Sequence, residues 1–215
     1  MRSISLLASA VVVLTACSSA PSAPSETPAQ AAPQSSYKPP PSEQAPEHYT
    51  VNFDTTKGLV VVDVTRADAP NGADRFYNLV KSKFFDGTRF FRVVPNFVVQ
   101  WGIAAEPAVT KTWDKPIPDD PVKQSNARGT LVFAAQSRPN TRTAQMFINL
   151  VDNPRLDGMG FAAFGKVTSG MEFVDQIFSG YGEAPDQDRI TNEGNAYLEK
   201  EFPNLDYIRT ATIAR

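Results

Sequence analysis

Residues able to do acid–base, nucleophilic or metal chemistry are few in this chain of 215 residues, which has one His, His48, and one Cys, Cys17. Metal sites rich in His, Cys-x-x-Cys redox pairs and internal disulfides need more of these side chains than the sequence supplies, and a Ser/His/Asp triad would need His48. His48 opens a predicted strand far in sequence from every motif below, so we expect it to be structural or solvent-facing. Any chemistry must therefore proceed without the usual general bases or thiols, and we expect no metal.

An arginine and a glutamine stand within an apolar run. Residues 90–100 read FFRVVPNFVVQ, which places Arg92 and Gln100 among hydrophobic neighbours. Judged by residue type alone, such an Arg reaches the surface along its apolar stem or pairs with an acid. Gln100 alone is an ordinary polar residue of a strand. Residue type alone therefore does not decide between a structural role and a chemical role for these two side chains.

The elements that would position these side chains are mostly strands. Short β-rich stretches recur over residues 48–215, and hydrophobic periodicity predicts one helix opening at Pro70 and another after Gly170, with a shorter one around Asn195–Glu201. The predicted strands are 48–54, 59–65, 88–94, 97–101, 129–135, 145–151, 161–168 and 205–213. This pattern predicts a mainly β fold, an eight-stranded antiparallel closed barrel capped by two α-helices.

Three motifs, in order, resemble one family. FFRVVPNFVVQ at 90–100 resembles the FHRxxPxFxxQ signature of the cyclophilin-type peptidyl-prolyl isomerases. TRTAQMFINL at 141–150 resembles a family segment ending in SQFFI, and LDG at 156–158 followed by FGKV at 164–167 resembles LDG…FGKV. The resemblance implies a cyclophilin-like barrel and an enzyme that isomerises X–Pro bonds of polypeptides, with no cofactor and no covalent intermediate.

The resemblance also implies a site. Arg92 matches the catalytic Arg of the family, a donor for the proline nitrogen as the amide twists, and Gln100 matches a polar neighbour. The family's substrate-binding positions are matched by Phe97, Val98, Ala135, Gln136, Gln145, Phe147, Leu156 and Phe161. The apolar members would grip the proline ring, and the backbone at 135–136 would hydrogen-bond an extended substrate.

Several positions depart from the family pattern. Phe91 replaces a His, Val98 stands where Met is common, Gln136 replaces Asn, Arg155 stands where the family has Trp or Phe, and residues 101–103 read Trp-Gly-Ile instead of Gly-Gly-Asp. We expect altered substrate preference more than lost activity. An alternative stays open, a membrane-tethered module or chaperone that binds Pro-containing segments with little or no turnover. Display of the barrel as a surface scaffold is a third interpretation.

The stretch 179–204 is longer than expected before the last strand. It is interpreted either as a partner-binding loop or as a packed cap.

The N-terminal residues predict export and lipidation. Residues 1–16 contain Arg2 and an apolar run, 4–16, that is too short to span a bilayer and fits a secretory signal peptide. Leu14-Thr15-Ala16-Cys17 resembles the bacterial lipobox, which implies a lipid anchor on Cys17. An ordinary signal peptide with a chance Cys, or a buried N-terminal helix, is the alternative. Ser18 after the Cys favours the outer membrane, facing the periplasm.

Residues 17–47 would join this anchor to a domain at 48–215. Eight of residues 18–47 are Pro and few are apolar, which predicts a disordered tether, with a Pro-rich ligand for a partner as the alternative. The formal net charge is −2, so the chain lacks the basic surplus of a nucleic-acid binder. We expect a monomer that contacts its polypeptide substrates and, through the lipid, a membrane.

Overall fold

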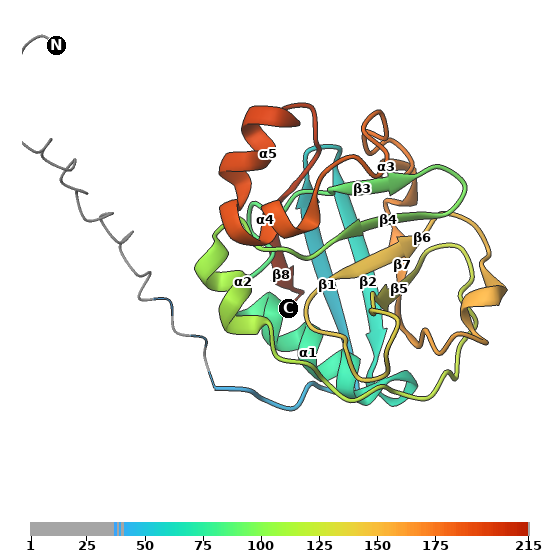
Figure 1. Ribbon diagram of the computed structural model, residues 1–215. Coiled ribbons are helices and arrows are strands. Elements are labelled where there is room, and N and C mark those ends of the chain that lie inside the picture. Colours follow the sequence, from blue (N-terminus) through green and yellow to red (C-terminus); the bar gives the residue numbers. More distant parts are fainter. Residues whose placement is uncertain (1–36, 38, 40, 215) are drawn as a thin grey trace, which may run out of the picture. The chain divides into compact units, whose positions relative to one another are not determined.

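The computed structural model describes residues 37, 39 and 41–214 (Figure 1). Its strands form one antiparallel sheet with the order β3-β4-β6-β5-β7-β2-β1-β8. The strands are β1 (His48–Thr55), β2 (Leu59–Thr65), β3 (Arg92–Val94), β4 (Val98–Trp101), β5 (Thr130–Phe133), β6 (Met146–Asn149), β7 (Ala163–Ser169) and β8 (Ile208–Ile213). The prediction of a mainly β fold with eight antiparallel strands is confirmed. The predicted signal peptide and Cys17 lie outside the described residues.

The sheet is open, so the prediction of a closed barrel is wrong. Its edge strands, β3 and β8, form no ladder with each other in the described part of the chain. Residues 88–91, predicted as the start of the strand 88–94, run instead beside the start of β8 and the residues before it, where the Phe90 amide donates to the Asp206 carbonyl at 3.0 Å. On the other edge, the Val93 amide donates to the Gly182 carbonyl at 3.1 Å. The two edge strands therefore bond to irregular segments and form no ladder with each other.

The helices are more numerous than the two predicted as caps. Within residues 41–214 the α-helices are α1 (Pro70–Lys81), α2 (Pro107–Trp113), α3 (Met171–Val174), α4 (Gln187–Glu193) and α5 (Asn195–Glu201). The helix predicted at Pro70 and the short one at Asn195–Glu201 are confirmed, and α3 is a single turn. α2 and α4, each of seven residues, were not predicted. None of the described helices has the length and apolar character needed to cross a membrane.

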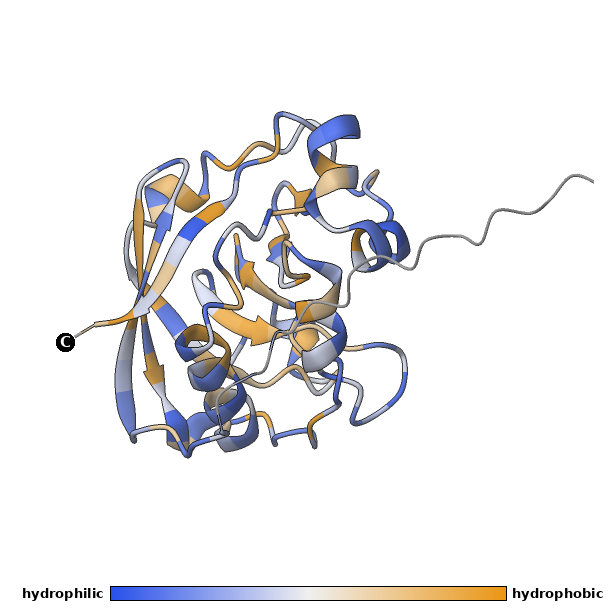
Figure 2. Ribbon diagram, turned by 90° about the vertical axis from the view of Figure 1, so that its left-hand side faces the viewer, coloured by the Kyte–Doolittle hydropathy of each residue, from blue (hydrophilic) through white to orange (hydrophobic). Residues whose placement is uncertain are grey.

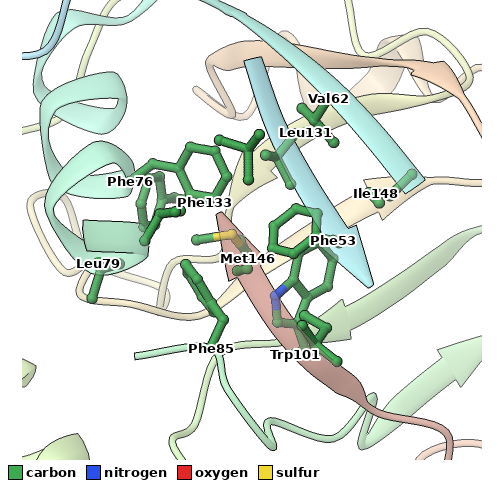
Figure 3. Packing of buried hydrophobic residues seen from close by; sticks show 14 of the residues in the cluster. Phe53, Val62, Phe76, Leu79, Phe85, Trp101, Leu131, Phe133, Met146 and Ile148 are labelled. Atoms are coloured by element: carbon green, nitrogen blue, oxygen red, sulfur yellow. The ribbon is translucent and has the colours of Figure 1, made fainter. Parts of the chain in front are cut away.

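The main core lies between the sheet and α1. The Phe76 ring of α1 lies 6.0 Å from Phe53 on β1 and 5.4 Å from Phe164 on β7, measured between ring centroids. Phe53 in turn meets Trp101 edge-on at 5.9 Å, and these rings gather in one buried cluster (Figure 3). The hydrophobic stretches follow the strands, and the helices show hydrophilic faces (Figure 2). Burial of such rings supplies much of the driving force for this fold.

Strand alternation creates a second apolar face. Successive side chains of a strand point to opposite faces, and in β4 Val99 and Trp101 join the main core whereas Val98 joins a separate cluster. In β6, likewise, Ile148 belongs to the main core and Phe147 to the second cluster. Strands β4, β6 and β5 therefore present an apolar patch on the side of the sheet away from the main core.

Residues 41–47 pack against α1, although a tether was predicted to run through residue 47. The Glu43 amide donates to Asn78 Oδ1 at 2.9 Å, and Asn78 Nδ2 donates back to the Glu43 carbonyl at 2.7 Å. The Ala45 amide donates to Asp74 Oδ1 at 2.9 Å, and Ala45 is buried. The structure differs from the prediction here because polar side chains of α1 satisfy the backbone of this Pro-rich stretch.

Candidate active site

A cavity of about 270 Å³ opens over the second apolar face. Its walls come from β3, β4, β6, the residues after β5 and the short 3-10 helix η2 (Pro154–Leu156) with the loop that follows it. The lining residues are Arg92, Phe97, Val98, Gln100, Ala134, Ala135, Phe147, Arg155, Leu156, Met159 and Phe161. The structure thus brings eight of the predicted site residues together around one cavity.

The two remaining predicted residues of the domain line an adjoining cavity of about 430 Å³. Gln136 and Gln145 contribute to its wall, and Gln100 and Ala135 face both cavities. The Gln136 amide already donates to Thr141 Oγ1 at 3.0 Å. A chain leaving the first cavity along this wall would therefore run past Ala135 into the second cavity.

The floor of the first cavity is apolar. Val98, Phe147 and Leu156 are buried there, and Phe97 and Phe161 pack against them while staying partly exposed. The Phe147 and Phe161 rings meet edge-on, with centroids 5.8 Å apart. Such a floor accepts a small apolar ring and offers it no hydrogen bond.

A row of polar side chains borders this floor. Arg92 on β3 lies opposite Gln100 on β4 in the strand register, and its Nη1 donates to Gln100 Oε1 at 3.0 Å. Gln100 Nε2 donates in turn to Gln145 Oε1 at 2.8 Å. The guanidinium carbon also lies 5.8 Å from the centre of the Phe97 ring, a distance that allows a cation–π attraction. The row places a half-buried positive charge at the edge of an apolar cavity.

Four residues at the site were not predicted as site residues, and one of them, Ala134, lies in the cavity wall next to the predicted Ala135. Glu183 accepts a 2.5 Å hydrogen bond from Arg92 Nε. Arg155 lies with its guanidinium carbon 4.7 Å from the centre of the Phe97 ring, and the Met159 side chain stands at the rim, 65% exposed. Arg155 was recognised only as a departure from the family pattern, and no sequence signal linked Glu183 or Met159 to the cavity.

Two of the departures from the family pattern lie away from the cavity. Trp101 is fully buried in the main core, and Phe91 is buried in a third cluster with residues of α4 and α5. Val98 and Arg155, in contrast, line the cavity itself. The departures at positions 91 and 101 therefore change the packing of the sheet and not the lining of the site.

His48 and the acidic residues of the described part of the chain form no candidate metal centre. His48 stands at the start of β1, where its Nδ1 lies 3.4 Å from Thr65 Oγ1. The described residues contain no group of three or more His, Cys, Asp and Glu side chains that could hold a metal ion.

A network of buried Asn side chains connects the loops that form the floor of the first cavity. Asn126 Nδ2 donates to Asp157 Oδ1 at 2.7 Å and to the Phe161 carbonyl at 2.8 Å, and Asn126 Oδ1 accepts from Asn149 Nδ2 at 3.1 Å. Asn153 Nδ2 donates to Asn149 Oδ1 at 2.8 Å. Asn126 and Asn149 are fully buried. The network ties together the loops that carry Leu156 and Phe161, so it fixes the shape of the floor.

Asp157 gives this network a pH dependence. Hydrogen bonds from the Ser125 hydroxyl and from Asn126 hold the pKa of Asp157 below its ordinary value. A carboxylate with a lowered pKa in the folded state contributes stability above its unfolded pKa of about 3.9, and that contribution is lost as the pH falls through the folded pKa. We therefore expect Asp157→Asn to have a lower Tm than the wild type at pH 7. The difference in Tm between the two proteins should shrink progressively below about pH 4. Thermal melts followed by circular dichroism from pH 7 to pH 2 check this, and parallel Tm curves for the two proteins would contradict it.

Comparison with known sequences finds a matching family and similar proteins. A family model described as cyclophilin type peptidyl-prolyl cis-trans isomerase/CLD matches residues 50–195. A peptidyl-prolyl cis-trans isomerase of Acinetobacter baylyi is 38% identical over 132 residues, which are 59% of this chain and 70% of that protein. Peptidyl-prolyl cis-trans isomerase B of Escherichia coli is 34% identical over 140 residues, 59% of this chain and 82% of that protein.

Comparison with solved structures shows the same fold. A cyclophilin type peptidyl-prolyl cis-trans isomerase of Cryptosporidium parvum superposes with a TM-score of 0.59 at 19% identity, covering 78% of this chain and 98% of the other. A second structure of that protein, in the presence of the dipeptide Ala-Pro, gives a TM-score of 0.59 at 21% identity and covers 77% and 99% of the two chains. At these identities the likeness concerns the fold alone.

Proposed function

This chain belongs to the cyclophilin-type peptidyl-prolyl cis-trans isomerase family, and on that premise we propose that it acts on exported proteins from a lipid anchor, with Arg92 as its catalytic donor. The family gives the activity, isomerisation of X–Pro bonds in polypeptides without a cofactor. The proposal adds the residues that perform the reaction and the place where it occurs.

The reaction is limited by rotation about one bond. Partial double-bond character gives the amide a rotational barrier of about 18–20 kcal/mol, so uncatalysed X–Pro isomerisation takes roughly tens to hundreds of seconds. As the amide twists, its nitrogen becomes pyramidal and gains a lone pair. A hydrogen-bond donor fixed beside that nitrogen stabilises the twisted form more than either planar form, which is the requirement for catalysis.

Arg92 is suited to donate this hydrogen bond. Gln100 holds its Nη1 and Glu183 holds its Nε, while Nη2 makes no hydrogen bond to the described residues. The side chain is 23% exposed, so its charge is shielded from part of the solvent without being sealed off from a ligand. A fixed guanidinium at the edge of an apolar cavity is the observation that carries the proposal, because it joins a donor to a site for the proline ring.

The apolar floor would hold the ring while the other side of the bond rotates. Phe97, Phe147 and Leu156 offer surfaces on which a pyrrolidine ring can bury its carbons. The similar proteins of Acinetobacter baylyi and Escherichia coli are named as peptidyl-prolyl cis-trans isomerases, which supports a Pro-containing ligand for this cavity. Residues ahead of the proline would follow the wall at Ala135 into the adjoining cavity.

A protease-coupled isomerisation assay tests the proposed site. The full chain, solubilised in mild detergent, is mixed with a panel of X-Pro peptides that differ in the residue before Pro. We expect the slow phase of cleavage to accelerate in proportion to enzyme concentration. A folded chain that binds these peptides without accelerating the slow phase would support the alternative, a module that holds Pro-containing segments.

We also propose that Cys17 carries the lipid that holds the enzyme at a bacterial membrane. The support is the lipobox-like sequence at 14–17, and Ser18 favours the outer membrane, where the enzyme would face the periplasm and exported proteins fold. In cells fed a labelled fatty acid, we expect the wild-type chain to be labelled and to sediment with outer membranes. Cys17→Ser should lose the label and become soluble. Equal labelling of the two chains would contradict a lipid on Cys17.

A further inference from the structure

The segment between α3 and α5 supplies a charged partner for Arg92. Arg92 Nε donates to Glu183 Oε1 at 2.5 Å, although the two residues are 91 positions apart in the sequence. We propose that Glu183 is a positioning residue for isomerisation, holding the guanidinium through Nε so that it lies at the cavity edge before substrate arrives. This inference rests on the proposed role of Arg92 and adds a residue from outside the three family motifs.

The backbone that carries Glu183 is firmly held. Gly182 accepts a hydrogen bond from the Val93 amide, next to Arg92 on β3, at 3.1 Å. The Tyr181 ring packs edge-on between Phe178 and Phe202, with centroids 5.0 Å away in each case. Of the two interpretations of residues 179–204, the structure therefore favours a packed cap, and the cap presents one carboxylate to the catalytic candidate.

Two contacts restrain the guanidinium better than one. Gln100 binds Nη1, and a single hydrogen bond at one end of the planar group would let the group pivot about it. Glu183 binds Nε at the other end. An Arg side chain has many rotamers, so fixing one of them costs conformational entropy. When the side chain is ordered before substrate binds, this cost does not fall on the reaction step. Loss of Glu183 should thus reduce turnover while leaving the apolar floor, and hence peptide binding, nearly intact.

Variants of Glu183 measure this effect in the full chain. We expect Glu183→Ala to lower kcat about two- to fivefold, with a smaller change in the Kd of a Pro-containing peptide measured by NMR titration. Glu183→Gln keeps an acceptor oxygen for Nε and should retain more kcat than the Ala variant. Glu199→Ala is the matched control, because Glu199 forms a comparable pair with Arg89 at 2.9 Å and is similarly exposed, but lies outside both cavities. Its kcat should equal that of the wild type.

Spectroscopy separates positioning from a merely structural role. In the wild type, the Nε–H of Arg92 should give a resolved NMR resonance that exchanges slowly with water, and this signal should be lost in Glu183→Ala at an unchanged Tm. A wild-type or raised kcat in Glu183→Ala would overturn the inference, since a raised value means that Glu183 competes with substrate for Arg92. A fall in kcat matched by Glu199→Ala would overturn it as well.

Different results would contradict the inference about Glu183 and the proposed function of Arg92. If Arg92→Ala abolishes most turnover while Glu183→Ala keeps the wild-type kcat, Arg92 keeps its role and the positioning role is wrong. If Arg92→Ala retains full turnover, the proposed donor is wrong and Glu183 has nothing to position.

Discussion

Replacement of Arg92 by Ala is expected to lower kcat/KM about ten- to hundredfold in the protease-coupled assay. A charge-assisted hydrogen bond contributes about 1.5–3 kcal/mol, and each 1.36 kcal/mol lost from transition-state stabilisation lowers the rate about tenfold. The fold should survive, because Arg92 lies at the end of an edge strand and its side chain is not part of the main core. Arg92→Lys should recover only part of the rate, since an ammonium keeps the charge without the planar fork.

The control for this experiment is a second arginine paired with an acid. Arg209 on β8 pairs with Asp54 at 3.1 Å and lies outside both cavities, so Arg209→Ala should keep wild-type turnover. Turnover within twofold of the wild type in a folded Arg92→Ala protein would remove Arg92 from the mechanism. The site would then be better interpreted as a binding surface.

Replacement of Asn126 by Ala is expected to cost about 2–4 kcal/mol of unfolding free energy, a large part of the roughly 5–15 kcal/mol of a typical domain. The fully buried Asn126 amide donates to Asp157 and to the Phe161 carbonyl. Removing it leaves the Phe161 carbonyl without that donor and weakens the attachment of the loop that carries Leu156. Urea denaturation at 25 °C measures the loss, and kcat/KM should fall too because the floor is no longer fixed.

An exposed asparagine provides the comparison. Asn192 on α4 donates only to the Asp188 carbonyl one turn earlier, at 2.8 Å, so Asn192→Ala should cost less than about 0.5 kcal/mol. If Asn126→Ala lost no more stability than this, the buried network would not be what holds the floor.

What could be predicted from the sequence was local or lay within a continuous motif. Alternation of apolar residues marked β1 and β2, and residues 90–100 held Arg92, Phe97, Val98 and Gln100 in one run. Their convergence with Phe147 and Leu156 follows from the resemblance, which transfers a known arrangement.

The features that escaped prediction depend on contacts between distant segments. Residues 88–90 bond to residues 206–208 outside any regular ladder, and composition does not predict that pairing. The packing of residues 41–47 depends on Asn78 and Asp74 of α1, which satisfy a backbone whose Pro content suggested disorder. Glu183 contacts Arg92 because the neighbouring Gly182 carbonyl accepts a hydrogen bond from the Val93 amide of β3.

Because β1 pairs with β8, this enzyme cannot finish folding until both strands have been synthesised. Asp54 on β1 and Arg209 on β8 are 155 positions apart, yet they belong to adjacent strands. At a synthesis rate of about 5–20 residues per second, the first strand waits roughly ten to thirty seconds for its neighbour. Pairings between such distant segments also form slowly. During that interval β1 presents an unpaired edge to other chains, so this isomerase is itself open to misassembly until β8 emerges.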